Sequence, residues 1–433
     1  TANATAASTA GSVIGIDDVG DNAGDFIFGT TADITTNVGT SADRVTVAAT
    51  ASTTTGDANA TSLLENNIGI SETGDGQIQV GTNGTITANA FNATNASATT
   101  TSGVADASAT IENASGIDMF DAAGTEAVLI TGQAATVSST ANTSSTVVAS
   151  AVTGTADASS ELVETSGVEI EAVSAGTSGT ITGTDTATLS ASATSVDEAA
   201  TAIGSNTEAD AVEFASFTAG TTGAVTGTTN STVSASATSA DDDAIATVNP
   251  TAAMATAVTT YGAFTVGTSG AITGTTSLNQ SATATTVGNS ASGDIAAAAI
   301  GQVISSGSGA AGTDNTQSVY GVDNNLTTTF GTSGTVSGTA NSTNTATASA
   351  VNAAASSYIN TEIQTGADLA TLTTGQDATV TGIANNSSTA AASTTTGIAT
   401  SQAILDETKG AQITSVTTGT SATITGTDTA TLS

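Results

Sequence analysis

Residues 176–195 read GTSGTITGTDTATLSASATS, and a second copy of this pattern begins at Gly220 as GTTGAVTGTTNSTVSASATS. Shorter copies begin at Gly81, Gly132, Gly267, Gly331, Gly375 and Gly419, and a weaker copy begins at Gly29. The spacings between the eight clear starts are 51, 44, 44, 47, 64, 44 and 44 residues. The basic unit therefore has 44 residues, and a period of this length indicates a tandem repeat architecture.

One position in every unit is β-branched. The residue five places after each starting glycine is Ile86, Val137, Ile181, Val225, Ile272, Val336, Val380 or Ile424. Thr or Ser follows it in every copy, and Gly comes next in six of the eight. This register predicts a short strand with one inward Ile or Val, ended by a bend at the glycine.

Alternation continues after this point. Residues 184–195 read TDTATLSASATS, which is the period of a strand with one buried face made mostly of Ala. Alternating runs before the starting glycines supply the aromatic residues Phe214, Phe217 and Phe264. The longest unit carries an insertion within residues 284–330, which we interpret as a loop or short helix near residues 294–304.

These patterns predict an all-β fold, a single continuous β-solenoid-like array over residues 1–433 with three or four short strands per unit. Stacking of the units would place the recurrent Ile and Val in a ladder inside the array. The alternative is a series of tandem β-sandwich modules, whose cores normally need more large apolar residues than these repeats contain.

Composition excludes several functions. The net charge is −36, from 38 acidic residues against only Arg44 and Lys409, so nucleic acid and anionic membranes are poor partners. The sequence contains no run of about 20 apolar residues, so we expect no insertion into a membrane. Without His or Cys there is no catalytic triad and no thiol nucleophile. Pairs of carboxylates could serve as the acid and base of a glycosidase. Sugar-binding subsites, however, usually contain aromatic side chains, and this chain has only three Tyr and no Trp. We therefore expect no enzyme and no required cofactor.

Calcium is the most reasonable ligand, because it binds six to eight carboxylate and carbonyl oxygens. Two acidic clusters are candidate Ca²⁺ sites. One contains Asp17, Asp18, Asp21 and Asp25, and the other contains Asp241, Asp242 and Asp243. Neither has EF-hand spacing, so solvated acidic loops are the alternative interpretation.

The repeats at Gly176 and Gly220 resemble the Thr/Ala/Gly-rich β-strand repeats of large bacterial surface proteins. These include long adhesins, surface-layer-like proteins and extracellular matrix fibre proteins. The resemblance covers nearly the whole chain and implies secretion, attachment at the cell surface and often calcium. It carries over no site residues.

We therefore expect an extracellular or cell-surface structural protein, a subunit or segment of a filament, surface layer or matrix fibre. The alternatives are an adhesin stalk and a phage-type fibre. Copies of the chain itself are the expected partner, with divalent cations or surface glycans as further candidates. Residues 419–433 match residues 176–190 at 14 of 15 positions, while residues 1–9 resemble the second half of the motif. Two explanations fit: a window of a longer repetitive protein, or head-to-tail pairing that builds a polymer from elongated subunits.

Overall fold

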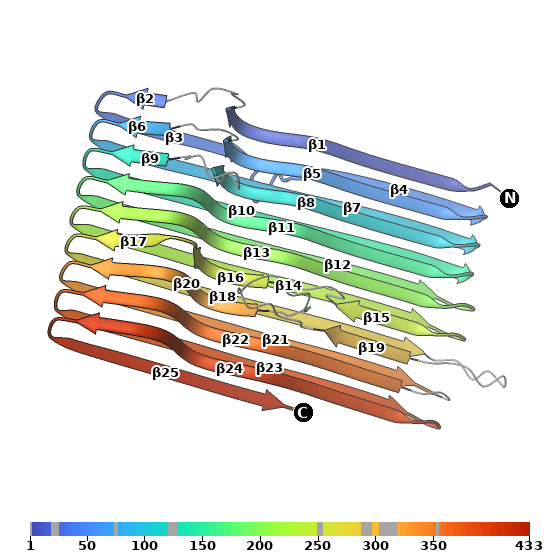
Figure 1. Cartoon of the computed structure of the whole chain (residues 1–433). Coiled ribbons are helices and arrows are strands. Elements are labelled where there is room, and N and C mark those ends of the chain that lie inside the picture. The colour runs from blue at the N-terminus through green and yellow to red at the C-terminus, as the bar shows by residue number, and fades with distance from the viewer. Residues whose placement is uncertain are drawn as a thin grey trace.

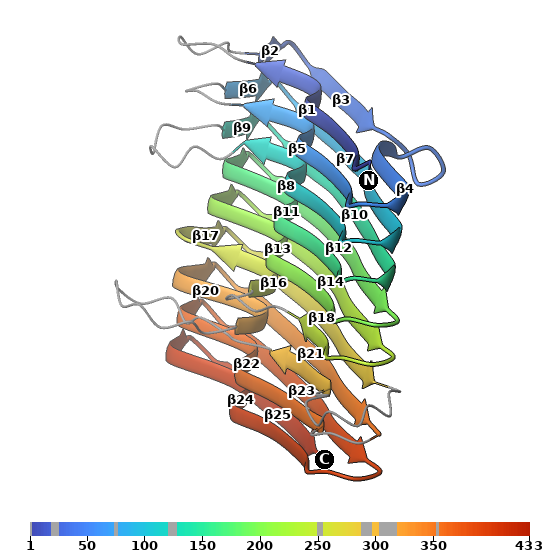
Figure 2. The same cartoon turned by 90° about the vertical axis from the view of Figure 1, so that its right-hand side faces the viewer.

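The computed structural model describes residues 2–18, 26–72, 77–119, 128–248, 254–286, 297–302, 318–351 and 355–433. These residues form an all-β structure without a helix. Their strands form two parallel sheets, which lie face to face as two layers (Figures 1 and 2).

The larger sheet contains fifteen strands. They are β1 (Ala4–Asp18), β2 (Phe26–Phe28), β5 (Ala58–Glu72), β6 (Gln77–Val80), β8 (Ala105–Met119), β9 (Val128–Thr131), β11 (Ala156–Ala175), β13 (Ala200–Ala219), β15 (Ala244–Val248), β16 (Met254–Thr260), β17 (Ala263–Val266), β19 (Ala297–Gln302), β20 (Ser318–Phe330), β22 (Ala355–Thr374) and β24 (Ala399–Thr418).

The smaller sheet contains ten strands. They are β3 (Thr31–Val38), β4 (Val45–Thr55), β7 (Asn83–Ser102), β10 (Ala134–Thr153), β12 (Ser178–Ser195), β14 (Thr222–Ser239), β18 (Ser269–Thr286), β21 (Ser333–Ala350), β23 (Asp377–Thr394) and β25 (Ser421–Leu432).

The chain alternates between the two sheets, so that each strand pairs in parallel with the corresponding strand of the next unit. Strand β12, for example, lies between β10 and β14, and β13 pairs with β11. Figure 1 shows the units following one another from the N-terminal to the C-terminal edge. This parallel pairing differs from the antiparallel sheets that β-sandwich modules would contain.

The pairing register aligns the recurrent Ile and Val side chains in one ladder across the smaller sheet. In the interior of the sheet, from Ile86 to Val380, no member of this ladder is more than 1% exposed. The weaker copy of the repeat adds Ile34 at one end, opposite Ile86. The expected inward register is confirmed, because the side chains on either side of each ladder residue point outward.

Two predictions about the unit are wrong. A typical unit has two long strands, such as the 18-residue β12 and the 20-residue β13, rather than three or four short ones. Gly183 also lies inside β12 and does not end it. A Cβ atom on Gly183 would overlap the carbonyl oxygen of Ala211 in the opposite sheet. The glycine therefore permits a close approach of the two sheets, and no bend is needed.

This close approach forms a waist, which we define as the paired columns containing Gly183, Gly227, Gly274, Gly338 and Gly382 in the smaller sheet and Ala211, Ala257, Gly321, Gly366 and Gly410 in the larger one. The core has two main clusters. One consists chiefly of Ala with a few Leu, Ile and Val, and the other is rich in Ile, Val and Phe. The repeat therefore builds two thin cores from small and β-branched side chains.

Phenylalanine rings fill the space left by a second glycine column. The rings of Phe217 and Phe264 stack with centroids 4.6 Å apart, and Phe330 meets Phe264 edge-on at 5.6 Å. A Cβ on Gly179 or Gly270 would contact the Phe217 or Phe330 ring, respectively. The aromatic residues noted in the sequence thus require glycine on the facing strands.

The insertion differs from the predicted loop or helix where it is described. Residues Ala297–Gln302 form strand β19, which pairs with β15 and β22. The neighbouring residues 287–296 and 303–317 lie outside the described residues. Pairing on both sides favours the extended conformation over a helix for this Ala-rich segment.

The first and last strands lie at opposite edges of the stack (Figure 1). The molecule is nevertheless longer along its strands than along the stacking direction, contrary to the elongated body that we expected. A 20-residue strand such as β13 spans about 66 Å, whereas the nine stacked levels from Ala4 to Ala399, about 4.8 Å apart, span only about 38 Å.

Candidate functional site

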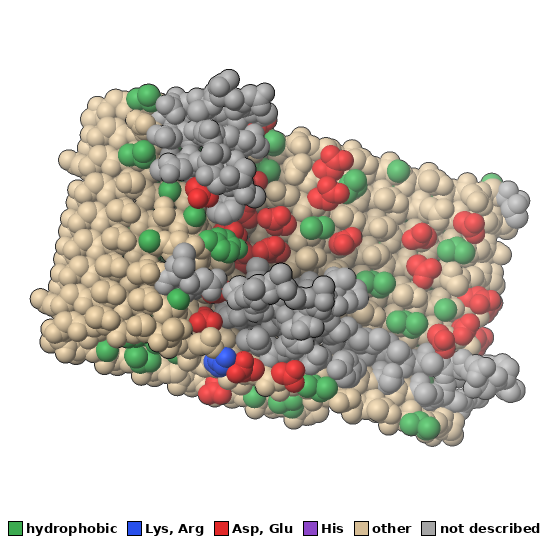
Figure 3. Space-filling model, viewed as in Figure 1, with side chains coloured by type: hydrophobic (Ala, Val, Ile, Leu, Met, Phe, Trp, Pro, Cys, Tyr) green, Lys and Arg blue, Asp and Glu red, His purple; other side chains and the backbone are tan. Residues whose placement is uncertain are grey.

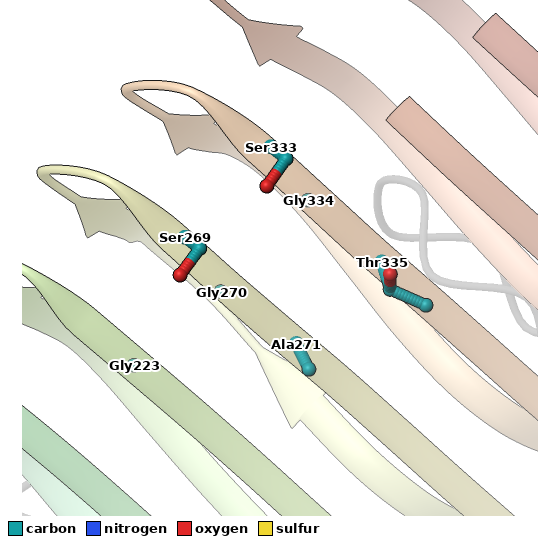
Figure 4. A pocket seen from close by; sticks show the side chains of 7 residues that line it. All are labelled: Gly223, Ser269, Gly270, Ala271, Ser333, Gly334 and Thr335. Atoms are coloured by element: carbon teal, nitrogen blue, oxygen red, sulfur yellow. The ribbon is translucent and has the colours of Figure 1, made fainter. Parts of the chain in front are cut away.

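The surface depression shown in Figure 4 lies on the smaller sheet between β18 and β21 and has a volume of about 320 Å³. Gly223, Ser269, Gly270, Ala271, Ser333, Gly334 and Thr335 line it. The lining contains no ionisable side chain. It therefore offers neither an acid–base pair nor a carboxylate ligand for a hard cation.

The predicted calcium ligands near the N-terminus are only partly described. Asp17 is exposed on β1, and Asp18 is the last residue of that strand. Asp21 and Asp25 lie outside the described residues. Calcium binding by this first cluster stays a prediction.

The second predicted cluster forms the turn between β14 and β15. The Asp243 backbone N–H donates to the Asp242 carboxylate at 2.8 Å, and the Asp242 N–H donates to Ser239 Oγ at 2.9 Å. Asp241 is exposed. Asp242 thus has a local role in the turn, and calcium binding there also stays a prediction.

The structure brings acidic residues together elsewhere, along the larger sheet. Parallel pairing aligns Asp118, Glu169 and Glu213 on three consecutive strands, and further along the same row it aligns Asp323 with Asp368. Neighbouring strands are only about 4.8 Å apart, so like charges in register repel each other. Figure 3 shows acidic side chains gathered on this face of the molecule.

The centre of this region is the carboxylate cluster, defined as Glu208, Asp210 and Glu213 of β13. One carboxylate oxygen from each residue lies within 4.8 Å of the other two, and among the described residues no other group of three potential ligands is as close. Asp210 is 1% exposed, while Glu208 and Glu213 are partly exposed. The cluster therefore extends from the surface into the protein.

Local strand irregularity explains how these three residues meet. In a regular strand, Glu208 and Asp210 share one face and Glu213 points to the other. The four consecutive buried residues 209–212 break the alternation of β13, and Ala211 is one of three residues, with Thr207 and Ala215, that are missing from its pairing with β11. The irregularity adjoins the waist, since the Ala211 carbonyl faces Gly183.

Two buried acids lack complete hydrogen bonding. Among the described residues, neither carboxylate oxygen of Asp210 has a hydrogen-bond partner. Asp185 of β12 is fully buried; its Oδ2 accepts a bond from the Thr165 hydroxyl at 2.8 Å, but its Oδ1 has none. A buried carboxylate without a partner is unfavourable, so this region favours uptake of protons or a cation.

No basic side chain in the described part of the chain neutralises the cluster. Arg44 donates to the backbone oxygens of Asn92 and Asn142, and Lys409 pairs with Glu407 at 2.9 Å. These are the only two basic residues in the sequence.

The pKa values follow from this environment. Burial, followed by the charge of Glu208, raises the pKa of Asp210 well above its usual range. Burial also raises the pKa of Glu213 to about 7, reinforced by Glu208 and opposed by a hydrogen bond from Tyr261. Burial alone raises the pKa of Asp185 to about 7, against its hydrogen bond from Thr165. The region can therefore exchange protons near neutral pH.

Sequence reasoning missed this cluster. The two acidic clusters predicted from the sequence do not include the segment VDEAATAIGSNTEAD, residues 196–210, or Glu213. The available signal was the spacing of acids in EADAVE, residues 208–213, together with Glu164 and Glu169, which lie at the same distances before Gly176 as Glu208 and Glu213 lie before Gly220. Their convergence required both the strand pairing and the irregularity of β13.

Comparison of the chain with protein-family models, curated proteins and solved structures finds no match. In the part of the chain that the structure describes, no helix is long and apolar enough to span a membrane.

Proposed function

We propose that this chain is a structural, non-enzymatic subunit or segment of an extracellular filament, surface layer or matrix fibre. In this proposal the repeats form a β-solenoid, and subunits assemble head to tail by adding the first unit of one copy to the last unit of another. The extracellular location rests on the resemblance of the repeats to those of bacterial surface proteins.

The supporting observation is one sequence found in two environments. The octapeptide ITGTDTAT occurs at residues 181–188 in β12 and again at residues 424–431 in β25. Ile181 is fully buried, whereas Ile424 is 52% exposed. A side chain that is buried inside the ladder at Ile181 is thus exposed at β25, where a further unit, from a continuing chain or from another copy, would cover it.

The strand order is compatible with such an addition. The final strand β25 belongs to the smaller sheet and β1 to the larger sheet, so a following copy would continue the alternation. In the described pairings, β24 and β25 each pair on one side only, as does β1 at the other end. Unpaired strand edges favour pairing with another chain.

The register across the larger sheet gives a specific alignment. One column contains alanine at every level: Ala4, Ala58, Ala105, Ala156, Ala200, Ala244, Ala297, Ala355 and Ala399. Placing Ala4 of a second copy over Ala399 would extend this column without a change of side chain. The proposed interface therefore has the register of the pairings inside one chain.

Electron microscopy and analytical ultracentrifugation of the full chain test this proposal. We expect stacks that lengthen with protein concentration. Ile424→Asp should leave single subunits, because the charge would lie inside the new interface. Thr425→Asp is the matched control, since its position alternates to the outer face and should leave the stacks intact.

A wild-type protein that stays monomeric at all concentrations and salt conditions would overturn the proposed assembly. Equal effects of the two substitutions would overturn the register. Circular dichroism of each variant checks that the sheets remain folded, which is expected because residues 424 and 425 are both already exposed.

A further inference from the structure

We infer that Glu208, Asp210 and Glu213 form a binding site for a divalent cation of the Ca²⁺ type. This site differs from both clusters that the sequence suggested, and it does not depend on assembly of the chain. Oxygens no more than 4.8 Å apart can all reach one Ca²⁺ ion, because ligands on opposite sides of Ca²⁺ are separated by about 4.6–5.2 Å.

Asp210 gives the strongest reason for a ligand. Its side chain is 1% exposed, and among the described residues neither of its oxygens has a hydrogen-bond partner. One of its oxygens lies within 4.8 Å of an oxygen from each of two further carboxylates, Glu208 and Glu213, which are partly exposed. This arrangement provides an inner ligand and two ligands along an entry path.

The opposite sheet adds an independent observation. Asp185 of β12 is fully buried with Oδ1 unpaired, and its charge acts on Asp210. Glu164 and Glu169 of β11 add further negative charge at the cluster. Acids from both sheets thus converge without a compensating Lys or Arg in the described region, which favours a doubly charged cation.

Protons are the competing means of neutralisation. A proton bound by Glu208 would remove the negative charge that Glu208 places beside Asp210. The other charged or polar groups that act on the carboxylate cluster are Glu164 and Glu169 of β11, Asp118 of β8, Asp185 and the Tyr261 hydroxyl. A cation would displace such protons, so binding should strengthen as pH rises and should release protons.

Isothermal titration calorimetry with CaCl₂ on the full, chelator-treated chain at pH 8 tests the site. We expect Asp210→Asn to lower the affinity of one calcium site by about tenfold or more, since the buried carboxylate ligand becomes neutral. Asp242→Asn is the matched control, because it removes an acid from the sequence-predicted cluster and should leave this binding step unchanged. Titrations in buffers of different ionisation enthalpy should show proton release in the wild type.

Thermal unfolding checks whether the Asp210→Asn variant is folded. In chelator at pH 8, Asp210→Asn should melt at or above the wild-type temperature, because it removes a buried unpaired charge. Calcium should then raise the melting temperature of the wild type more than that of the variant. If the wild type and Asp210→Asn bind calcium equally, or if only acid and not calcium stabilises the wild type, the inference is overturned in favour of protonation alone.

Terbium luminescence gives a local readout. The Tyr261 hydroxyl bonds to the Glu213 carboxylate, and a tyrosine beside a bound Tb³⁺ ion sensitises its emission. We expect Tyr261→Phe to reduce the sensitised emission while calorimetric calcium binding persists. Unchanged emission would show that the ion lies elsewhere and would contradict the proposed site.

Discussion

Replacing Ile181 with alanine should destabilise the protein far more than the same replacement at Ile424. Both residues begin the octapeptide ITGTDTAT, so local sequence and strand propensity are the same. Ile181 is fully buried and Ile424 is 52% exposed. The comparison therefore isolates burial inside the stack from every local property of the repeat.

The magnitudes follow from the two environments. Truncating a fully buried Ile to Ala costs about 2–5 kcal/mol, because it removes buried methyl groups and leaves a cavity. About half of that apolar surface is already hydrated at Ile424, and no further strand covers it, so we expect a loss of about 1 kcal/mol or less. Urea unfolding followed by circular dichroism, at concentrations below any assembly, measures both values.

Equal losses at the two positions would refute the assigned ladder, as would a loss below about 1 kcal/mol at Ile181. Concentration supplies a further check. If copies stack as proposed, the cost of Ile424→Ala should rise toward that of Ile181→Ala where the assembled form dominates, because Ile424 then becomes covered.

Three other outcomes are expected. Gly338→Ala should lower the melting temperature, because the added Cβ would overlap the Gly366 carbonyl oxygen. Gly29→Ala should have little effect, because a Cβ there would meet no atom within 4 Å. Similar effects of the two substitutions would contradict the close approach of the sheets. In chelator, stability should fall as pH rises from about 4 to about 7, since burial raises the pKa of Asp185 to about 7 and the folded state holds its proton. Asp185→Asn should remove up to about 4 kcal/mol of that dependence, and an unchanged pH profile would count against it. At low ionic strength, divalent cations should promote association of this −36 chain by bridging acidic segments, and chelation without any effect on assembly or melting would exclude that role.

Several features were predictable because they depend on local periodicity. The 44-residue spacing and the strict alternation around Ile181 identified β-strands and the inward side of each strand in the smaller sheet. Identical residues at identical positions of successive units align when the units pair in register, so the ladder also followed from the repeat.

The length of the strands could not be predicted from the sequence. The glycine at position 183 looked like a bend because glycine is common where strands end. Its requirement comes from the opposite sheet, whose backbone at Ala211 leaves no room for a side chain. A single strand pattern does not specify how near another sheet will lie.

What the sequence by itself determined is therefore the β-repeat, the inward Ile and Val register, the acidic surface and the lack of His and Cys chemistry. Only the tertiary structure decided the two-sheet waist and the meeting of Glu208, Asp210 and Glu213, with Asp185 contributed from the other layer. The physical reason is that periodicity fixes which side of a strand each residue occupies. Distances between sheets, and irregularities such as that at residues 209–212, arise only when the packed layers constrain each other.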